Sequence, residues 1–178
     1  MAALAEPLLM TVQQYRELPQ RDDVVTELHW GQVVTLTRPK MKHAKLQSRL
    51  VRLLRPKAEH LGVIESEVAF RALAEYDLRA ADVAFVSRER WDNTVDDDNL
   101  SGSPELVIEV LSPSNTKREM YEKATLYLAT GAEEFWIVDA KQKNVTVVGR
   151  QGSTVYEMGE LIPLPLFGSS LSAADIFA

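Results

Sequence analysis

Apolar runs and polar breaks along the chain predict a mixed order of strands and helices. Residues 106–112, LVIEVLS, form an apolar run too short for a helix, which predicts a strand covered on both faces. Further strand-like runs lie at residues 24–30, 32–38, 63–70, 82–87, 135–139 and 144–150. The first two of these runs flank Gly31 and predict a hairpin.

Three segments predict helices. The first begins after Thr11, a possible cap, and ends before Pro19. The second spans about residues 41–61, with Pro56 expected to bend or shorten its end. It has an apolar face made of Leu46, Leu50, Leu53 and Leu54. The third spans about residues 116–130 and is terminated by Gly131.

The order of these elements predicts the α/β class, with a central mixed β-sheet and helices against it. Strand 106–112, helix 116–130 and strand 135–139 form a β-α-β unit, which is expected to be parallel and right-handed, with Glu109 in a central strand. Residues 91–105 are polar and turn-rich and are read as a surface connection. The last segment, with Pro163 and Pro165 and a short DIFA end, has a weaker pattern.

Length and composition predict a single domain over residues 1–178, because 178 residues with 46% hydrophobic content suit one core. The chain has no Cys, which excludes disulfides, thiolate catalysis and thiolate zinc sites and fits a cytoplasmic location. The start MAALAEPLLM lacks the features of a secretory signal, and no apolar stretch approaches the roughly 20 residues that a membrane helix needs. We therefore expect a soluble protein without membrane contact.

Charge is segregated along the chain. The net charge of −6 argues weakly against general affinity for polyanions. Residues 38–57, however, contain eight basic and no acidic side chains. On the helix predicted there, one stripe is formed by Lys42, Lys45, Arg49 and Arg52. The stripe is either a solvated helix face or a contact for a phosphate backbone, and the sequence leaves both possibilities open.

Glu109 stands in an otherwise aliphatic strand, where an unpaired carboxylate would cost several kcal/mol or take up a proton. It therefore needs a cation, a metal ion or a wet cleft. Asp82 opens the apolar run of a neighbouring strand, so the two carboxylates could share one hard divalent cation. Magnesium suits such a pair because it completes its shell with water and substrate phosphate. Further acids near the sheet are Glu27, Glu67 and Asp139.

A lysine beside these carboxylates could position the attacking water or stabilise the charge of the transition state. Lys117 and Lys123 both project toward the sheet, and helix geometry alone does not choose between them. A structural alternative is a buried ion pair of Glu109 with one of these lysines, and Asp82 alone could be a strand-end cap or a turn residue. Action of the two acids on sugars would require no lysine between them.

Other conspicuous residues have simpler explanations. His43 is expected at the surface or as a helix cap, and His29 and His60 lack ligand spacing with it. Acidic residues 96–98 miss the spacing of an EF-hand loop and are expected to be solvated. Trp91, Trp136 and Tyr127 are expected to serve in packing.

Residues 104–139, PELVIEVLSPSNTKREMYEKATLYLATGAEEFWIVD, resemble the signature of the Uma2-like family, formerly a domain of unknown function (DUF820), of the PD-(D/E)XK nuclease superfamily. The resemblance extends more loosely over most of the chain. It implies a restriction-endonuclease-like core in which Asp82 and Glu109 bind the metal and Lys123 is the catalytic lysine. Two positions depart from the superfamily pattern: Leu111 stands where the lysine is usual, and Ala81 where a proline precedes the aspartate.

Glu27, in TELHWG, is similar to the family's ELxxG position, where it could contact a second ion or a water. From residues and resemblance together we expect a cytoplasmic Mg²⁺- or Mn²⁺-dependent endonuclease that hydrolyses DNA phosphodiester bonds. Lys42, Lys45, Arg49 and Arg52 would contact the DNA backbone. The alternative is a non-catalytic nucleic-acid-binding or dimeric assembly module with the same fold. The resemblance also makes a homodimer plausible.

Overall fold

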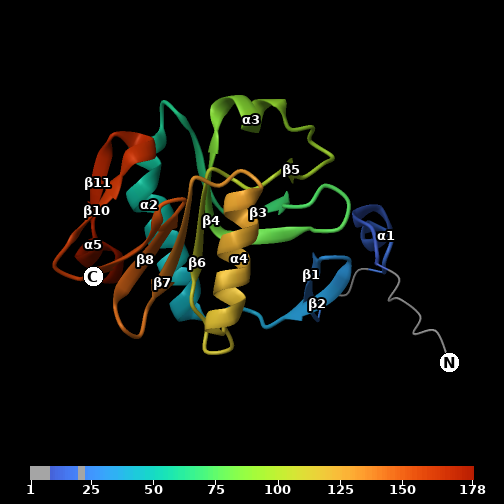
Figure 1. The fold of residues 1–178 in the computed structure, drawn as a ribbon, viewed down its shortest axis with the longest axis horizontal. Helices are drawn as coiled ribbons and strands as arrows, with labels where there is room; N and C mark the ends of the chain where they lie inside the picture. Colours follow the sequence, from blue (N-terminus) through green and yellow to red (C-terminus); the bar gives the residue numbers. More distant parts are fainter. Residues whose placement is uncertain (1–8, 20–22) are drawn as a thin grey trace.

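A seven-stranded mixed sheet forms the middle layer of the protein (Figure 1), which we describe from a computed structural model covering residues 9–19 and 23–178. Its strand order is β5-β3-β4-β6-β7-β8-β9. The strands are β3 (Gly62–Arg71), β4 (Arg79–Ser87), β5 (Leu100–Ser101), β6 (Leu106–Val110), β7 (Glu134–Asp139), β8 (Asn144–Gly149) and β9 (Gly152–Glu157). The central position in this order belongs to β6, the strand that carries Glu109.

The pairing of these strands confirms the predicted mixed sheet. β6 runs parallel to β7 and antiparallel to β4, and β7, β8 and β9 follow one another as antiparallel neighbours. The connection between β6 and β7 is α4 (Lys117–Ala129), so the predicted β-α-β unit is present. Since β6 is covered on both faces, all five of its residues are buried.

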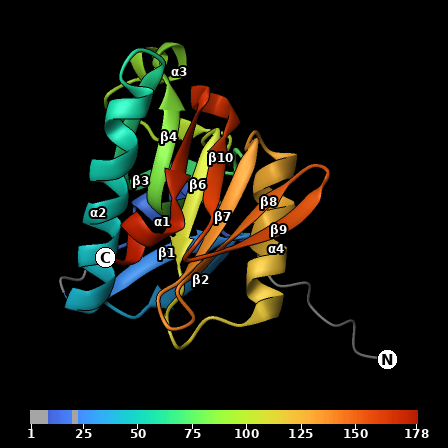
Figure 2. The same ribbon diagram turned by 90° about the vertical axis from the view of Figure 1, so that its left-hand side faces the viewer.

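Helices α2 (Met41–Ala58) and α4 lie on opposite faces of the sheet (Figure 2). The side chains of β6 alternate between two cores, because successive residues of a strand point to opposite faces. Ile108 and Val110 join the core on the α2 side, and Val107 joins the core on the α4 side. Glu109 shares the parity of Val107 and therefore belongs to the α4 side.

Local sequence explains where α4 begins and ends. The Thr116 side chain accepts from the Glu119 backbone N–H, and the Glu119 side chain accepts from the Thr116 N–H, which satisfies donors that a helix start leaves open. Gly131 follows with φ of 132°, a conformation that side chains with a Cβ rarely adopt. Inside the helix, Tyr127 is fully buried between Phe70 and Phe135, with ring centroids 5.3 and 5.5 Å away.

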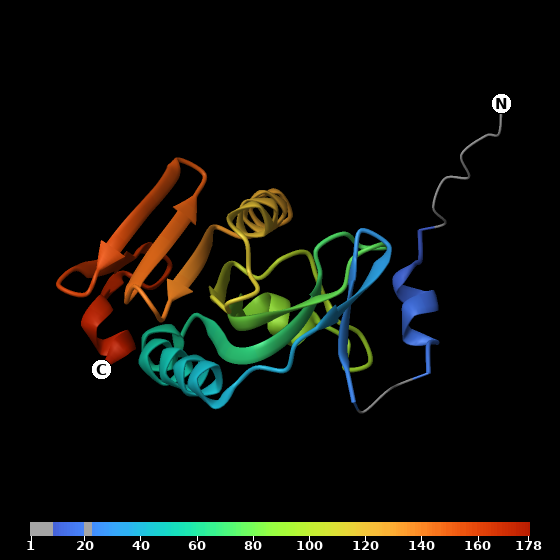
Figure 3. The same ribbon diagram turned by 90° about the horizontal axis from the view of Figure 1, so that it is seen from below.

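The hairpin of β1 (Val25–His29) and β2 (Gln32–Leu36) lies beside the main sheet, as Figure 3 shows, with α1 (Val12–Arg16) beyond it. Its tight turn contains Gly31 at φ 74°, as the sequence predicts. A bridge between Leu28 and Leu78 ties the hairpin to the residue that precedes β4. Thr11 caps α1 through a capping box, also as predicted.

The C-terminal segment contains more regular structure than its weak pattern indicated. It forms β9, a separate hairpin of β10 (Leu161–Leu164) and β11 (Ser169–Ser172), the short 3₁₀ helix η1 (Pro165–Phe167) and α5 (Ala173–Phe177). Buried residues of this segment, such as Ile162 and Ile176, complete the core on the α2 side. α5 packs beside α2 (Figure 3).

The region after β4 differs from the sequence-based expectations in two details. Residues 91–105, expected as a surface connection, also contain regular structure, because α3 (Arg88–Asn93) overlaps their start and β5 lies within them. α3 buries none of its residues and so has no apolar period, while β5 has two residues, too few for a pattern. Trp136 and Tyr127 are core residues as expected, but Trp91 on α3 is 39% exposed.

Helix α2 ends at Ala58, three residues before the predicted end, and contains Pro56 in its last turn. Within the residues that the structure describes, no helix is both long and apolar enough to cross a membrane.

Candidate active site

Glu109 and Lys123 form a buried ion pair between the central strand and α4. The Lys123 ammonium donates to Glu109 Oε2 over 2.8 Å, and the two residues are only 9% and 8% exposed. Lys117 is exposed at the first residue of α4. Tertiary structure therefore selects Lys123, six residues further into the helix, as the lysine beside the acid.

The second oxygen of Glu109, Oε1, is buried without a hydrogen-bond partner among the described residues. Burial raises the pKa of Glu109 to about 7, and the charges of Asp82 and Glu27 act in the same direction, although Lys123 lowers it. A buried carboxylate oxygen without a partner lowers the stability of the fold, so such groups are rare and are typical of sites that bind a water, an ion or a substrate. Glu109 is thus an acceptor with unused capacity in the middle of the sheet.

Burial alone would lower the pKa of Lys123, but the negative charge of Glu109 beside it raises this pKa above its usual value. Lys123 is therefore a cation at neutral pH. A cation can hold a water or an anionic oxygen in place, whereas a protonated ammonium cannot accept a proton. This favours the orienting role of the lysine over a general-base role.

Asp82 lies where β4 separates from β6. The β4–β6 pairing ends at Val83 and Ile108, so Asp82 and Glu109 occupy the next opposed positions. Asp82 Oδ2 accepts from the Val110 N–H over 2.7 Å, which places its carboxylate against the backbone beside Glu109. Residues two apart in a strand normally face the same side, but here Ala81 joins the core on the α4 side and Val83 joins the core on the α2 side. The alternation of β4 is therefore interrupted at Asp82.

Helix α2 holds Asp82 from the other side through two polar residues of its buried face. Gln47 Nε2 donates to Asp82 Oδ1 over 3.0 Å and to Glu67 Oε1 over 2.5 Å. His43 Nε2 lies 3.1 Å from both Asp82 Oδ2 and the Val110 carbonyl oxygen, and both neighbours are acceptors, so this nitrogen carries a proton. The hydrogen bond with Asp82 raises the pKa of His43, although burial opposes it.

Glu67 faces the same point of the sheet. It lies between the paired residues Ser66 and Val68 of β3, opposite Asp82, and has φ of 56°. A residue with a Cβ in this region costs of order 1–3 kcal/mol and persists only where its surroundings hold it, a condition common at functional sites. Here the hydrogen bond from Gln47 is one such restraint.

Three of these residues had no role in the sequence-based prediction. His43 was expected at the surface or as a helix cap. Both expectations are wrong, because Lys40 is the N-cap of α2 and His43 is half-buried against Asp82. Gln47 was not singled out, and Glu67 was only one acid among several. The available signal was the polar pair His43 and Gln47, one turn apart on the apolar face of α2, where a buried polar residue needs a partner.

Glu27 serves to attach the hairpin. Its Oε1 accepts from the Ala80 N–H over 2.8 Å, and its Oε2 accepts from His29 Nε2 over 2.6 Å. Burial alone would raise the pKa of Glu27, but these hydrogen bonds and the charge of Lys123 lower it. The carboxylate is therefore ionised and close enough to Lys123 to act on it, with both oxygens already engaged.

The predicted basic stripe lies on another flank of α2. Lys42, Lys45 and Arg52 are exposed, whereas Arg49 is half-buried and donates to the Ile176 carbonyl over 3.3 Å. At 100° per residue, Lys45 and Arg49 point about 160° away from Gln47. The stripe therefore does not face Asp82, and one ligand could touch both only by extending across α2.

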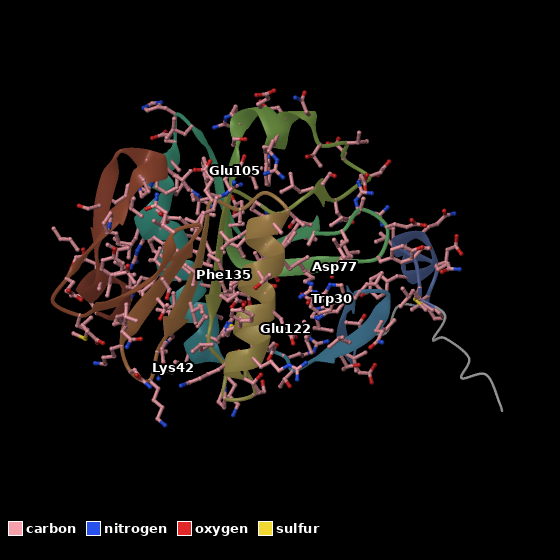
Figure 4. The ribbon with its side chains drawn as sticks, in the orientation of Figure 1. Trp30, Lys42, Asp77, Glu105, Glu122 and Phe135 are labelled. Atoms are coloured by element: carbon pink, nitrogen blue, oxygen red, sulfur yellow. The ribbon has the colours of Figure 1, made fainter. Side chains whose placement is uncertain are left out.

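A second buried ion pair lies next to this site. Arg79 donates through Nε and Nη2 to both oxygens of Asp77, at 2.8 to 3.0 Å, and its guanidinium lies 4.4 Å from the Trp30 ring centroid. Figure 4 shows Trp30 and Asp77 together on the hairpin side of α4. The Trp30 backbone N–H also donates to Asp77 Oδ2 over 3.3 Å. Sequence patterns gave no sign of this pair.

The donor set suits a hard divalent cation held by few protein ligands. Among the residues that the structure describes, no group of three or more His, Asp and Glu side chains is arranged to hold a metal ion. A cage made entirely of protein side chains is therefore absent from this part of the chain. Magnesium, however, commonly binds through one or two carboxylates, and the unpartnered Glu109 oxygen beside Asp82 fits that mode.

No curated protein matches the chain. Among solved structures, the chain is similar to the crystal structure of "a putative nuclease belonging to DUF820" from Anabaena variabilis ATCC 29413, with a TM-score of 0.79 and 21% identity. The alignment covers 94% of this chain and 97% of the other. At this identity the likeness establishes a shared fold.

The sequence pattern of a family also matches. The family is Uma2, described as "Putative restriction endonuclease", and the match covers residues 12–174. It spans the hairpin, both large helices, the whole central sheet and the β10–β11 hairpin, so the residues around Glu109 and those that tie the hairpin to them lie inside it. The chain therefore belongs to the Uma2 family.

Proposed function

We propose that this protein is a divalent-metal-dependent endonuclease that hydrolyses DNA phosphodiester bonds. The observation that carries the proposal is the Glu109 carboxylate: it is buried in the central strand, one oxygen accepts from Lys123, and the other has no partner among the described residues. Family membership supports a nuclease, and the fold shared with a structure described as a putative nuclease agrees with it.

Asp82 and Glu109 would hold Mg²⁺ or Mn²⁺. When bound, the ion supplies positive charge for the transition state and lowers the pKa of water. Asp82 is kept ready by hydrogen bonds from Val110 and His43 to Oδ2 and from Gln47 to Oδ1, which fix its carboxylate and leave acceptor capacity on Oδ1.

Lys123 would orient the attacking water and stabilise negative charge on the phosphate. Its ammonium is fixed by Glu109 and remains charged at neutral pH, so it offers donors to an anionic oxygen without taking up a proton. Glu27 would contribute through its charge, because both of its oxygens already bond within the protein.

The basic side chains of α2 would bind backbone phosphate. Lys42, Lys45 and Arg52 are exposed, and such contacts depend on charge and not on base sequence. Homodimerisation stays a prediction, which sedimentation would test.

The competing function is a non-catalytic binding or assembly module, for which the Glu109–Lys123 pair would be structural. The two functions predict different responses to metal. In a module, Mg²⁺ or Mn²⁺ leaves the melting temperature unchanged, whereas a metal-binding site raises it.

The test is cleavage of supercoiled, linear and single-stranded DNA with Mg²⁺ or Mn²⁺, by the wild type and by Glu109→Gln. We expect the wild type to cut at least one form and Glu109→Gln to be inactive. The matched control is Glu134→Gln, because Glu134 is a partly buried carboxylate on the neighbouring strand whose pKa burial also raises, but it lies opposite Leu106 at the far end of β6.

Equal activity of Glu109→Gln and Glu134→Gln would refute the assigned site. If the wild type shows neither metal-dependent stabilisation nor cleavage of any DNA form, the catalytic function itself is wrong.

A further inference from the structure

A groove with a basic lining lies between the N-terminal half of α2, the turn from β7 to β8 and the end of α5. Its volume is about 440 Å³. The four charged residues of its lining are all basic: Lys42, Lys45, Arg49 and Lys143. Its apolar lining includes Met41, Ile176 and Phe177. The groove is therefore locally positive, although the whole chain has a net charge of −6.

The cations of the groove are available to a ligand. The ammonium groups of Lys42, Lys45 and Lys143 make no hydrogen bond or ion pair with any residue that the structure describes, and all three side chains are exposed. Some basic groups outside the groove are engaged, as when Arg55 pairs with Glu65 or Arg90 with Glu105. Like charges left unpaired around one concavity repel one another, and an anion removes that cost.

The groove opens at the same end of the molecule as the candidate active site. β6 and β7 are parallel and end together, with Val110 opposite Val138, so the β7–β8 turn lies beside the end of the strand that carries Glu109. Figure 1 shows the starts of α2 and α4 and the β7–β8 turn together at the lower end, and Figure 4 shows Lys42 there. Helix α2 lies between the groove and Asp82, because Gln47 on one flank bonds Asp82 while Lys45 and Arg49 on the opposite flank line the groove.

Helix α2 therefore sets the spacing between the two sites. A helix with its side chains is about 10–12 Å across, and phosphates of one duplex strand advance about 3.4 Å along the axis per nucleotide. A strand with one phosphate at Asp82 and Glu109 would reach the groove roughly three nucleotides away. A single nucleotide or a small phosphodiester cannot span this distance.

We propose that this groove binds backbone phosphates of the same nucleic acid that is cut at Glu109, a few nucleotides from the scissile bond. The substrate class is then polymeric DNA, held at two points on either side of α2, and Lys143 is a binding residue that α2 alone does not reveal. The inference rests on the proposed function. The basic lining of the groove favours a polyanion as its ligand. Because the groove and the candidate active site lie at the same end of the molecule, that polyanion is the substrate itself.

The first experiment measures binding of a labelled DNA duplex against salt concentration, in the Glu109→Gln background so that cleavage does not intervene. Lys42, Lys45 and Lys143 are replaced together by Gln. We expect this variant to bind at least about tenfold more weakly near 100 mM salt, and its slope of log K against log salt to be flatter by about 2 to 3, since each lost phosphate contact contributes about 0.9.

A charge-matched control replaces three basic residues outside the groove, Lys57, Lys141 and Arg150, by Gln. We expect its affinity and salt slope to change much less. Melting curves for both triple variants show whether each is folded. An equal loss of affinity in the two folded triple variants would mean that general surface charge attracts DNA, and it would refute a specific role of the groove. The groove proposal would also be refuted if the Glu109→Gln parent, with the groove intact, binds no DNA.

The second experiment tests the span across α2 with the otherwise wild-type enzyme. Turnover of DNA is compared with turnover of bis(p-nitrophenyl) phosphate, which is too small to reach the groove. The groove variant should lose far more turnover on DNA than on the small ester, whereas equal losses on both would overturn the two-point geometry.

The two proposals can fail separately. If DNA binding depends on the groove but no DNA is cleaved, the proposed phosphate binding in the groove stands and the proposed endonuclease activity is refuted. Cleavage that is unaffected by the groove variant would leave the catalysis and refute the groove.

Discussion

Two buried ion pairs lie close together in this protein and differ in one respect. In the Asp77–Arg79 pair, both carboxylate oxygens accept from the guanidinium, and the Trp30 ring covers the cation. In the Glu109–Lys123 pair, one oxygen accepts from the ammonium and the other has no partner among the described residues. Tyr127 lies near both pairs: its ring centroid is 5.9 Å from the Arg79 guanidinium carbon, and the charges of Lys123 and Glu109 act on its hydroxyl.

The difference distinguishes an ion pair whose oxygens are all engaged within the protein from one that can still bind a ligand. Burial by itself does not distinguish them, because removing ions from water costs free energy in either case. The pair with every acceptor engaged has nothing left to bind a ligand and serves to fix the hairpin to the sheet. The pair with a spare buried oxygen has paid the desolvation cost and kept an acceptor, which is what a metal site requires.

The largest expected effect comes from breaking the saturated pair. Asp77→Ala should lower the free energy of unfolding by about 3–5 kcal/mol, because it leaves the buried Arg79 cation without a partner. Denaturant unfolding measures this. The double variant Asp77→Leu with Arg79→Met should recover most of the loss, since an apolar pair replaces both ions. A cost below 1 kcal/mol for Asp77→Ala would show that Trp30 alone can hold the cation.

A pH effect distinguishes the unsaturated pair. The folded-state pKa of Glu109, about 7, lies above its ordinary value of 4.5, so the folded protein binds the extra proton between these values. Stability from this group is therefore complete below about pH 4.5 and is lost as the pH rises to about 7, by up to roughly 3 kcal/mol. The raised pKa of Lys123 affects stability only at alkaline pH.

The measurement is the free energy of unfolding at intervals across that window, for the wild type and Glu109→Gln. The variant should lack this decline. An identical pH profile in the two proteins would show that Glu109 does not titrate in this range.

Metal binding should give an effect of similar size. Mn²⁺ at a hundred times its dissociation constant should stabilise the wild type by about 2.7 kcal/mol and Glu109→Gln not at all. A thermal melt with and without the ion measures it. The double variant of Asp77 and Arg79 should retain the gain, because that pair has no free acceptor. Stabilisation of Glu109→Gln equal to that of the wild type would place the ion elsewhere.

The smallest effect is expected at an exposed pair. Arg55 Nη2 lies 2.7 Å from Glu65 Oε1, as close as the buried pairs, but both side chains are about half exposed. Arg55→Ala should change the free energy of unfolding by only about 0.2–1 kcal/mol, because solvent screens the charges. A loss as large as that of Asp77→Ala would contradict the view that burial sets the cost of breaking an ion pair.

Much of this fold could be predicted from the sequence, and the exceptions have physical causes. Periodicity located β6, α4 and the hairpin at Gly31 because each has a long apolar pattern or a specific turn residue. It missed α3, which buries nothing, and β5, which is too short to show alternation. It also misplaced His43, because a histidine at a helix start usually meets water, whereas here the start of α2 lies against Val110.

The sequence by itself determined that an acid would be buried in the central strand, because an aliphatic run of strand length forces whatever it contains into the core. Only the tertiary structure decided which cation would meet that acid, which oxygen would remain free, and that His43 and Gln47 would hold Asp82. These contacts join residues that are tens of positions apart in the sequence, and they depend on how the helices pack on the sheet. The sequence pattern does not show that the pairing of β4 with β6 ends at Val83, which leaves the Val110 N–H to bond Asp82.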